Sequence, residues 1–175
     1  MKFCSICASP VVIETPPGDH LPRHVCPACG VIHYQNPRII TGCIPEWEDK
    51  ILICRRAIEP RHGYWTLPAG FMENGETVEH GAAREAHEEA LAHVNIGSLI
   101  AVVNVLRSQQ VHMMFRAELA NLDFGAGSES LEVKLVHPRD IPWADLAFES
   151  VRFTLERYIE DKAKGEERLH FHTIE

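Results

Sequence analysis

The sequence lacks an excess of positive charge, a long hydrophobic run and a secretion signal. It has 17 Lys and Arg residues against 25 Asp and Glu residues, a net charge of −8. This balance disfavours a nonspecific nucleic-acid binder, which normally carries a basic patch. No apolar run approaches the roughly 18 residues of a membrane span, so we expect no membrane contact. The first residues, Met-Lys-Phe-Cys, do not resemble a signal peptide, and we expect the protein in the cytoplasm.

A chain of 175 residues, 45% of them hydrophobic, is long enough to bury a sizeable core. Apolar spacing over residues 146–165 predicts a helix. Strand and helix segments mix without strict β-α-β alternation, so we expect an α+β sandwich. We also expect two domains, a cysteine-paired head at residues 1–35 and a main domain at residues 36–175. The expected strands of the main domain are residues 37–47, 50–56, 98–106, 109–119 and 130–136.

The head carries four of the six cysteines in two pairs, each with two intervening residues, and eighteen residues separate the pairs. This spacing is typical of a four-cysteine zinc site. A head of about 35 residues is too small to be held by core burial alone, so a metal would stabilise it. Two disulfides or a redox CxxC motif are the alternatives. The predicted zinc ligands are Cys4, Cys7, Cys26 and Cys29.

Four thiolates close the zinc coordination shell and leave no position for water, so the expected role of this zinc is structural. His20, His24 and His33 are alternative ligands in the same head. The remaining cysteines, Cys43 and Cys54, sit in apolar segments and are predicted to be reduced core residues.

The stretch from Gly70 to Ala90 holds six glutamates and one arginine. If Thr77 is the N-cap of a helix, three of these glutamates fall within about 100° of one another on one side of it. We call these three residues, Glu85, Glu88 and Glu89, the acidic stripe. A solvated helix face usually interleaves cations four residues from each Glu, but here such partners are scarce. Hard Mg²⁺ or Mn²⁺ prefers carboxylate oxygens, so a metal site is the alternative to a solvated face.

The stretch resembles the Nudix box, which reads Gly, five residues, Glu, seven residues, Arg-Glu, an apolar residue, any residue, Glu-Glu, any residue, Gly and an apolar residue. The matching positions are Gly70, Glu76, Arg84, Glu85, Ala86, Glu88, Glu89 and Ala92. Leu91 departs from the pattern, because it stands where the family has a glycine that ends the helix in a left-handed turn. Leu tolerates that conformation poorly, so we expect the helix to end later, near Asn95 or Gly97.

The resemblance implies a Nudix α/β/α sandwich with a mixed sheet, in which the acidic stripe binds catalytic Mg²⁺ or Mn²⁺. It implies that the carbonyl of Gly70 adds a metal ligand. It also implies that Arg84, which we include among the catalytic residues, pairs with Glu76 and braces the loop against the helix. In related enzymes a distal glutamate reaches the metals or acts as base. Glu132 fits that position best and Glu129 is second, each with a solvated strand-end charge as the alternative.

The resemblance covers nearly the whole chain, since the cysteine head, "YQNPR", "HGYWTLPAGF" and "LHFH" are similar to zinc-ribbon Nudix hydrolases related to plant FAD and ADP-ribose pyrophosphatases. It implies hydrolysis of a nucleoside diphosphate derivative, FAD or ADP-ribose, that releases AMP. NADH pyrophosphatases also carry the zinc head, but their Pro-rich motif is absent from "VVNVLRSQQVHMMF". NADH hydrolysis, nucleotide-cap hydrolysis and a non-catalytic nucleotide-sensing module are the alternatives.

Substrate contacts and assembly rest on fewer residues. Tyr64 is a candidate platform for an adenine or flavin ring, with core packing as the alternative. Arg55 is the expected contact for phosphate or ribose, and Arg56 and Arg107 are further candidates. Gly70 is also expected to take part in substrate binding. The expected partner is therefore a small-molecule nucleotide. By analogy with related Nudix enzymes we expect a homodimer, with the tail "LHFHTIE" available to dock on a partner.

Overall fold

The computed structural model describes residues 1–175 and divides them into two compact units, Met1–Pro37 and Arg38–Glu175. The first unit is a three-stranded antiparallel sheet in the order β1-β2-β3. Its buried apolar residues are few, and the side chains of β1 are all exposed. The unit therefore has little core to stabilise it. Its strands are β1 (Val12–Glu14), β2 (Arg23–Val25) and β3 (Ile32–His33).

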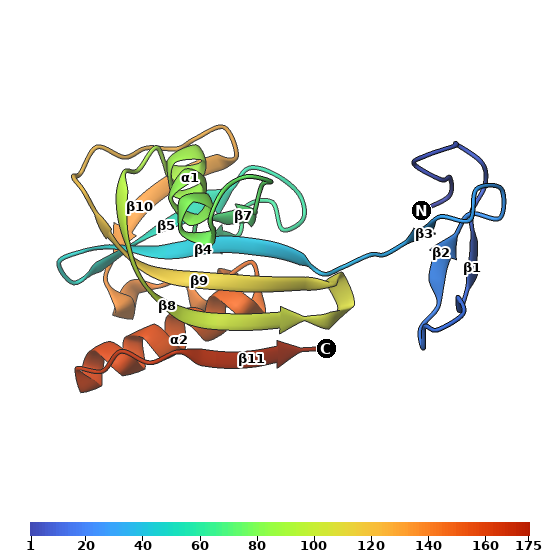
Figure 1. The fold of residues 1–175 in the computed structure, drawn as a ribbon. Helices are drawn as coiled ribbons and strands as arrows, with labels where there is room; N and C mark the ends of the chain where they lie inside the picture. The colour runs from blue at the N-terminus through green and yellow to red at the C-terminus, as the bar shows by residue number, and fades with distance from the viewer. The chain divides into compact units, whose positions relative to one another are not determined.

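The second unit is built on one eight-stranded sheet, whose main path runs in the order β10-β5-β4-β9-β8-β11 (Figure 1). The short strands β6 and β7 pair with β5 and β4 off this path. Its elements are β4 (Arg38–Trp47), β5 (Lys50–Arg56), β6 (Trp65–Thr66), β7 (Ala69–Phe71), α1 (Val78–Ala90), β8 (Val94–Val105), η1 (Leu106–Ser108), β9 (Gln110–Leu119), β10 (Ser130–Val136), η2 (Pro138–Asp140), η3 (Trp143–Asp145), α2 (Glu149–Lys164) and β11 (His170–Ile174).

The sheet is mixed, as expected from the sequence. Strands β4 and β9 run parallel with Thr41 opposite Met113, and β11 runs parallel to β8, whereas the other neighbours are antiparallel. Helix α1 covers one face of the sheet and α2 covers the other (Figure 1). Because successive strand residues point to opposite faces, each strand supplies side chains to both layers of core.

The two cores differ in size. The larger lies between the sheet and α2, where Ile44, Val103 and Leu155 pack together. The smaller lies under α1 in two clusters, one where alanines of the helix meet Cys43 and Phe115 and one where Ala90 meets Leu52 and Cys54. Small helix residues let α1 approach the sheet closely, and this approach brings the acidic stripe to the edge of the packed face.

The predicted strands of the main domain and the helix near residues 146–165 are confirmed. The tail was expected to be available to a partner, but it pairs with β8 of the same sheet, with Phe171 opposite Val102. The prediction that the first helix extends toward Asn95 is wrong. Helix α1 ends at Ala90, and Leu91 adopts the left-handed conformation itself, with φ 50° and ψ 20°.

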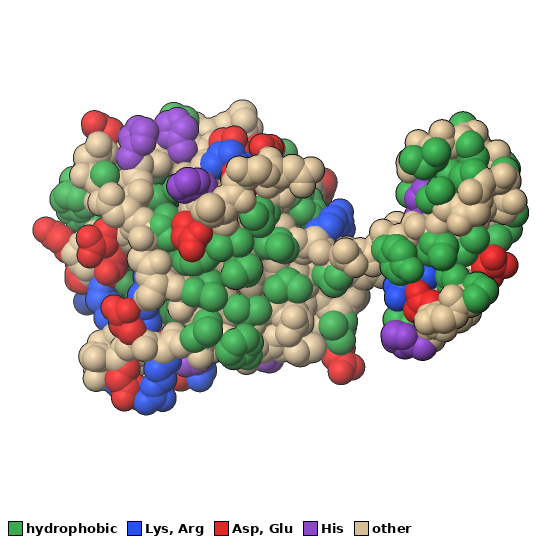
Figure 2. Space-filling view, in the orientation of Figure 1, with side chains coloured by type: hydrophobic (Ala, Val, Ile, Leu, Met, Phe, Trp, Pro, Cys, Tyr) green, Lys and Arg blue, Asp and Glu red, His purple; other side chains and the backbone are tan.

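Part of the α1-side face of the sheet has no helix over it. Apolar side chains gather there over the strands below α1 in Figure 2. Ile39 on β4 points to this side because Thr41, two residues further along the strand, does. Phe171 on β11 points to it because Val102, its partner on β8, does. Phe171 is 70% exposed. None of the helices has the length and apolar character needed to cross a membrane.

Candidate metal centres and active site

The four paired cysteines converge in the first unit. Their sulfur atoms all lie within 4.8 Å of one another, with 3.7 Å between Cys4 and Cys29 and 3.5 Å between Cys7 and Cys26. A tetrahedron of sulfurs about 2.3 Å from a zinc ion has edges of about 3.8 Å, so the thiols fit zinc. All four are free of disulfides, and hydrogen bonds from the backbone and hydroxyl of Ser9 lower the pKa of Cys7 to about 6, which favours its thiolate.

Each cysteine pair sits on a tight turn. Ala8 and Gly30 follow the pairs in the left-handed conformation, and their N–H groups donate to the carbonyls of Cys4 and Cys26 at 3.0 and 2.8 Å. Of the alternative histidine ligands, His33 approaches the cluster, with Nε2 3.4 Å from the sulfur of Cys4. The cluster therefore supplies four sulfur ligands, with one imidazole beside it.

In the second unit the acidic stripe is fixed by the start of α1 and by the loop before it. Thr77 is the N-cap, as predicted, and its hydroxyl accepts from the N–H of His80 at 3.2 Å. Gly70 on β7 touches the carboxylate of Glu85 so closely that a Cβ atom at this position would overlap it. A side chain at residue 70 would therefore displace this carboxylate, and the backbone of Gly70 lies against the first carboxylate of the stripe.

Arg84 joins the loop to the helix. Its guanidinium donates to Glu76 at 2.9 and 3.1 Å, to Glu85 at 2.7 Å, to Glu88 at 2.9 Å and to the carbonyl of Phe71 at 3.0 Å. These bonds raise the pKa of Arg84 and, with the N–H of Glu73, lower that of Glu76 to about 2. The pairing of Arg84 with Glu76 implied by the family pattern is thus present.

Glu89 lies deeper than the other two members of the stripe. Its side chain accepts only a long hydrogen bond from the N–H of Ala69, at 3.4 Å, and the residue is 7% exposed. Burial, followed by the charge of Glu85, raises the pKa of Glu89 to about 8. Burial also raises the pKa of Glu85, against the opposing effect of Arg84. The stripe therefore concentrates negative charge where the protein supplies too few cations to balance it.

This imbalance fits a divalent cation. Carboxylate oxygens are the donors that Mg²⁺ and Mn²⁺ prefer, and a bound cation would let Glu89 ionise despite its burial. The carboxylates are less tightly gathered than the thiols, since only the four cysteines bring three or more ligand atoms within 4.8 Å of one another. Arg84 takes one oxygen each of Glu85 and Glu88, and the second oxygens are left for a cation.

The two distal glutamates point to different places. Glu129 precedes β10, and its charge contributes to the raised pKa of both Glu85 and Glu89. Glu132 pairs with Arg55, 4.0 Å away. Arg55 sits opposite Trp65, which belongs to the core under α2, so Glu132 lies on the face away from the acidic stripe. The charge of Glu129 thus acts on the stripe, whereas Glu132, which the sequence had favoured, pairs with Arg55 on the other face.

The neighbouring arginines divide in the same way. Arg55 is exposed and donates to the carbonyl of Gly63 at 2.9 Å. Arg56 is buried, its Nε donates to the carbonyl of Pro60 at 2.9 Å, and its charge acts to lower the pKa of Glu89. Its guanidinium also lies 5.1 Å from the ring centre of Phe148, at the start of α2. Arg55, the arginine predicted to contact phosphate, therefore faces away from the stripe, and the charge of its neighbour Arg56 acts on Glu89.

Tyr64 lies on the loop that follows β5. The residue is 36% exposed, and the guanidinium of Arg61 stands 5.3 Å from its ring centre. Its backbone carbonyl accepts from the N–H of Arg56 at 2.9 Å. An exposed ring at this end of β5 is available to stack on a planar ligand. Trp65, in contrast, is a core residue.

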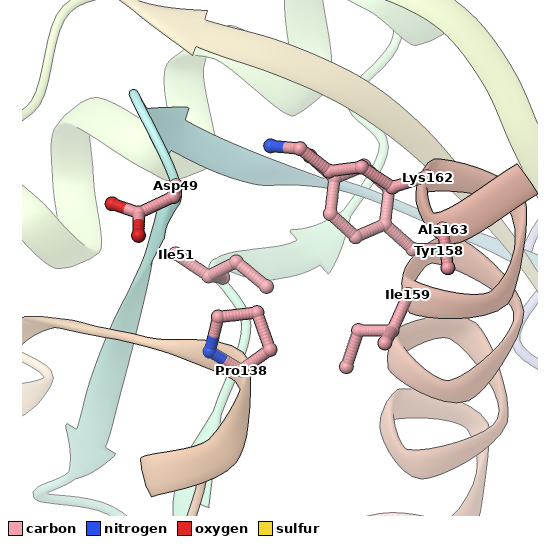
Figure 3. A pocket seen from close by; sticks show the side chains of 7 residues that line it. All are labelled: Asp49, Ile51, Pro138, Tyr158, Ile159, Lys162 and Ala163. Carbon is pink, nitrogen blue, oxygen red and sulfur yellow. The ribbon is translucent and has the colours of Figure 1, made fainter. Parts of the chain in front are cut away.

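A shallow pocket of about 150 Å³ opens elsewhere in the second unit (Figure 3). Its charged side chains are already paired: Lys162 with Glu46 at 2.6 Å, and Asp49 with His137 at 3.0 Å. It lies on the α2 side, away from the acidic stripe, and has no free polar group to recognise a nucleotide. The residues that line it are Asp49, Ile51, Pro138, Tyr158, Ile159, Lys162 and Ala163.

Sequence reasoning ranked Glu129 and Arg56 below their neighbours for one physical reason. Strand alternation tells which residues share a face, but both faces of β5 are buried, so composition does not show which face carries α1. In β10 a register shift between Ser130 and Glu132 adds to the difficulty. Cys54 identifies the α1 side of β5, because it packs near Ala90 of α1. Its neighbour Arg55 therefore points to the opposite face.

Comparison with protein families gives two adjoining matches. Residues 2–35 match the zinc-ribbon family described as "Nudix N-terminal", and residues 36–162 match the "NUDIX domain". A crystal structure of a NUDIX hydrolase from Nitrosomonas europaea is 54% identical, covers 99% of both chains and superposes with a TM-score of 0.96.

Two curated relatives have more specific names. An "ADP-ribose pyrophosphatase" from Methanocaldococcus jannaschii is 30% identical over 120 residues, which are 66% of this chain and 70% of that protein. The "NAD-capped RNA hydrolase NudC" of Stutzerimonas stutzeri is 29% identical over 163 residues, which are 90% of this chain and 56% of that protein. The chain thus spans little more than half the length of the NudC relative.

Proposed function

The chain belongs to the Nudix family, and from this premise we propose that it uses Mg²⁺ to hydrolyse the diphosphate bond of an ADP derivative, with ADP-ribose as the first substrate and FAD as the second. The observation that carries the proposal is the acidic stripe, with Glu89 buried and short of cationic partners. The relative named ADP-ribose pyrophosphatase supports the choice of ADP-ribose. The products are then AMP and ribose 5-phosphate.

In this proposal the acidic stripe and the carbonyl of Gly70 hold Mg²⁺ or Mn²⁺. A cation held there would neutralise phosphate oxygens and lower the pKa of the attacking water. Arg84 and Glu76 keep the loop and α1 in register, because their hydrogen bonds join the two. The two residues support the site and do not contact the reacting atoms.

Glu129 is our candidate for the proton acceptor. Its carboxylate takes a proton from the attacking water, whose oxygen bonds to phosphorus while the bridging P–O bond breaks. The proton then passes to solvent. The influence of Glu129 on the pKa of Glu85 and Glu89 supports this role. Glu132 is the alternative, and its pairing with Arg55 on the other face counts against it.

Recognition of the substrate falls to residues around the end of β5. We propose that Tyr64 stacks on the adenine ring and that Arg56 meets the diphosphate, in place of Arg55. The exposure of Tyr64 and the effect of Arg56 on the pKa of Glu89 support these assignments. An arginine beside a diphosphate offers several N–H donors in a fixed plane, which suits phosphate oxygens.

A second candidate substrate is NADH or an NAD-capped RNA end, because the NudC relative matches 90% of this chain, zinc ribbon included. ADP-ribose and NAD share an ADP half, so the same acidic stripe can serve both. The missing Pro-rich motif after the Nudix box favours ADP-ribose over NADH as the better substrate.

The test is a substrate panel. Purified protein is incubated with ADP-ribose, FAD, NADH and an NAD-capped RNA, with Mg²⁺ and with EDTA, and products are identified by mass spectrometry. We expect AMP and ribose 5-phosphate from ADP-ribose, and no product in EDTA. Faster cleavage of NADH or capped RNA would select the second candidate. Binding of ADP-ribose with no product in Mg²⁺ would identify a nucleotide-sensing module.

We also propose a homodimer formed through the uncovered apolar face around Ile39 and Phe171. The two side chains are 38% and 70% exposed, and burial of such residues drives subunit association. Light scattering should give twice the 19.8 kDa of one chain, and Phe171→Lys should give one chain's mass. A monomeric wild type would contradict this. Reduced buried thiols at Cys43 and Cys54 support a cytoplasmic location.

A further inference from the structure

The segment between β9 and β10 is bonded to the end of α1. The N–H of Gly125 donates to the carbonyl of Ala90 at 2.9 Å, and the N–H of Gly127 donates to the carbonyl of Glu89 at 3.0 Å. The last carbonyls of a helix have no partner within the helix, so these two bonds satisfy groups that α1 leaves open. The segment and the helix that carries the acidic stripe are therefore held together by main-chain bonds.

The other end of the segment is fixed as well. The carbonyl of Glu129 accepts from the N–H of Ala57, just after β5, at 2.8 Å, and the N–H of Ser130 donates to the carbonyl of Gly127 at 3.1 Å. Gly127 and Glu129 are two residues apart. The main chain on both sides of the Glu129 carboxylate is thus anchored, to α1 through Gly127 and to the end of β5 through Ala57.

Residue 127 must be glycine for reasons of space. A Cβ atom there would overlap the carbonyl oxygen of Glu88 and lie 2.9 Å from the carbonyl carbon of Glu88 and 3.1 Å from that of Glu89. All of these are backbone atoms, so no side chain can move aside. The φ of Gly127 is outside the left-handed region, so only the close approach to the helix demands glycine.

Gly125 is a matched contrast in the same segment. It makes the same kind of bond to α1, but a Cβ atom there would meet only the side chain of Leu91, at 3.7 Å, which is ordinary contact. Its φ is also outside the left-handed region. An added methyl group should therefore displace the segment at residue 127 and leave it in place at residue 125.

We propose that Gly127 is a positioning residue for hydrolysis: its missing side chain lets the segment dock on the end of α1, and the docked segment holds Glu129 beside the acidic stripe. The inference rests on the proposed function, in which Glu129 accepts the proton of the attacking water. It assigns to Gly127 no contact with substrate. It also predicts that Glu129 works only while the main chain at Gly127 remains bonded to Glu89.

The test compares Gly127→Ala, Gly125→Ala and Glu129→Gln in ADP-ribose hydrolysis. We expect Gly127→Ala to lower kcat at least about 10-fold, toward the value of Glu129→Gln, because general-base catalysis contributes roughly 10²–10⁴-fold. KM should change less than kcat. The kcat of Gly125→Ala should stay within about twofold of wild type, because an added methyl group at residue 125 makes only ordinary contact. The double variant Gly127→Ala/Glu129→Gln should be no slower than Glu129→Gln alone, and the two should share one pH profile.

Hydrogen exchange of the wild-type protein, without substrate, gives an independent reading. The amides of Gly125, Gly127 and Ala57 should be protected, and Gly127→Ala should remove the protection of the first two while α1 stays protected. Unprotected amides in wild type would overturn the proposal even if the variant does not fold. Wild-type kcat in a Gly127→Ala protein with lost protection would overturn it as well. If wild type does not cleave ADP-ribose, the proposed function fails, and the exchange data still decide whether Gly127 docks the segment.

Discussion

Leu91 shows how a single residue departs from the family pattern without changing the fold. It occupies the left-handed position at the end of α1, where its N–H donates to the carbonyl of His87 at 2.8 Å and the N–H of Ala92 donates to that of Ala86 at 3.3 Å. An L-residue with a Cβ atom pays roughly 1–2 kcal/mol in this conformation. Bonds from Gly125 and Gly127 to the neighbouring carbonyls hold the helix end in place, and they offset the strain.

Leu91→Gly should therefore stabilise the protein by about 1 kcal/mol, since the strain is relieved and part of the gain is lost to the greater freedom of glycine in the unfolded chain. Urea unfolding measures this change. The control is Leu106→Gly, at a position as exposed as Leu91 but outside the left-handed region, and it should destabilise. A lower unfolding free energy for Leu91→Gly would show that the left-handed leucine is not strained.

The two distal glutamates give a second prediction at this scale. Glu129→Gln should lower kcat for ADP-ribose by roughly 100-fold, the usual size of a general-base contribution, because the amide cannot accept the proton of the attacking water. Glu132→Gln should change kcat less than about threefold, as expected for a weak surface ion pair. The reverse order of effects would return the role of base to Glu132.

Residue types alone identified the acidic stripe and the N-cap, because local spacing on a helix is fixed by its period. They did not separate Glu129 from Glu132 or Arg56 from Arg55. That choice depends on which face of the sheet α1 covers, a long-range property that strand alternation alone does not reveal. Likewise Gly127 has no local signature, because its role arises from a helix more than thirty residues earlier in the chain.

Among the secondary-structure elements, β11 was not predicted, and a buried charge network explains its place. Asp161 on α2 accepts from Arg116 of β9 at 3.1 Å, from His170 of β11 at 2.9 Å and from the N–H of Arg168 at 3.3 Å. Burial alone would raise the pKa of Asp161, but the bonds from His170 and Arg168 and the charge of Arg116 hold it below its ordinary value. A short polar tail is thus tied to the sheet by contacts with residues distant in sequence.

Asp161→Asn should lower the free energy of unfolding at pH 7 by about 3 kcal/mol, because it leaves the partly buried Arg116 without its counter-charge. A lowered native pKa means that the stabilisation is present above the unfolded value near 3.9 and is lost as pH falls through the native value. The gap between wild type and Asp161→Asn should therefore shrink below about pH 4. Urea unfolding at several pH values measures it.

The control for this comparison is Glu156→Gln, an exposed acid on the same helix, which should change stability by less than about 0.5 kcal/mol. Hydrogen exchange should show that β11 loses protection first in Asp161→Asn. A gap between wild type and Asp161→Asn that stays constant down to pH 3 would mean that the charge of Asp161 does not stabilise the fold.

At the scale of the whole molecule, the two units differ in what holds them together. The second has a continuous core around Ile44 and Leu155, whereas the first has few buried apolar residues besides its cysteines. The cysteine spacing predicted this difference, because a head of that size needs a metal. The strand and helix patterns predicted the α+β architecture and the main strands, and the resemblance to the Nudix family implied the mixed sheet.

Removal of zinc should therefore unfold residues 1–37 and leave residues 38–175 folded. We expect one zinc ion per chain by elemental analysis, and loss of exchange protection confined to the first unit after treatment with a chelator. Thiol titration of the denatured protein without reductant should find six free thiols, the number that the structure contains. Two free thiols would indicate disulfides in place of zinc.

Whether the acidic stripe holds the catalytic metal is decided by the Mg²⁺-dependent rate of AMP release from ADP-ribose. The proteins to compare are wild type, Glu89→Gln and the control Glu79→Gln, an exposed glutamate of the same helix. We predict that Glu89→Gln folds normally but loses roughly 100-fold or more in rate, as follows removal of one group that stabilises charge in a transition state. Glu79→Gln should match wild type. A Glu89→Gln protein that releases AMP at the wild-type rate would contradict the assignment of the acidic stripe as the metal site.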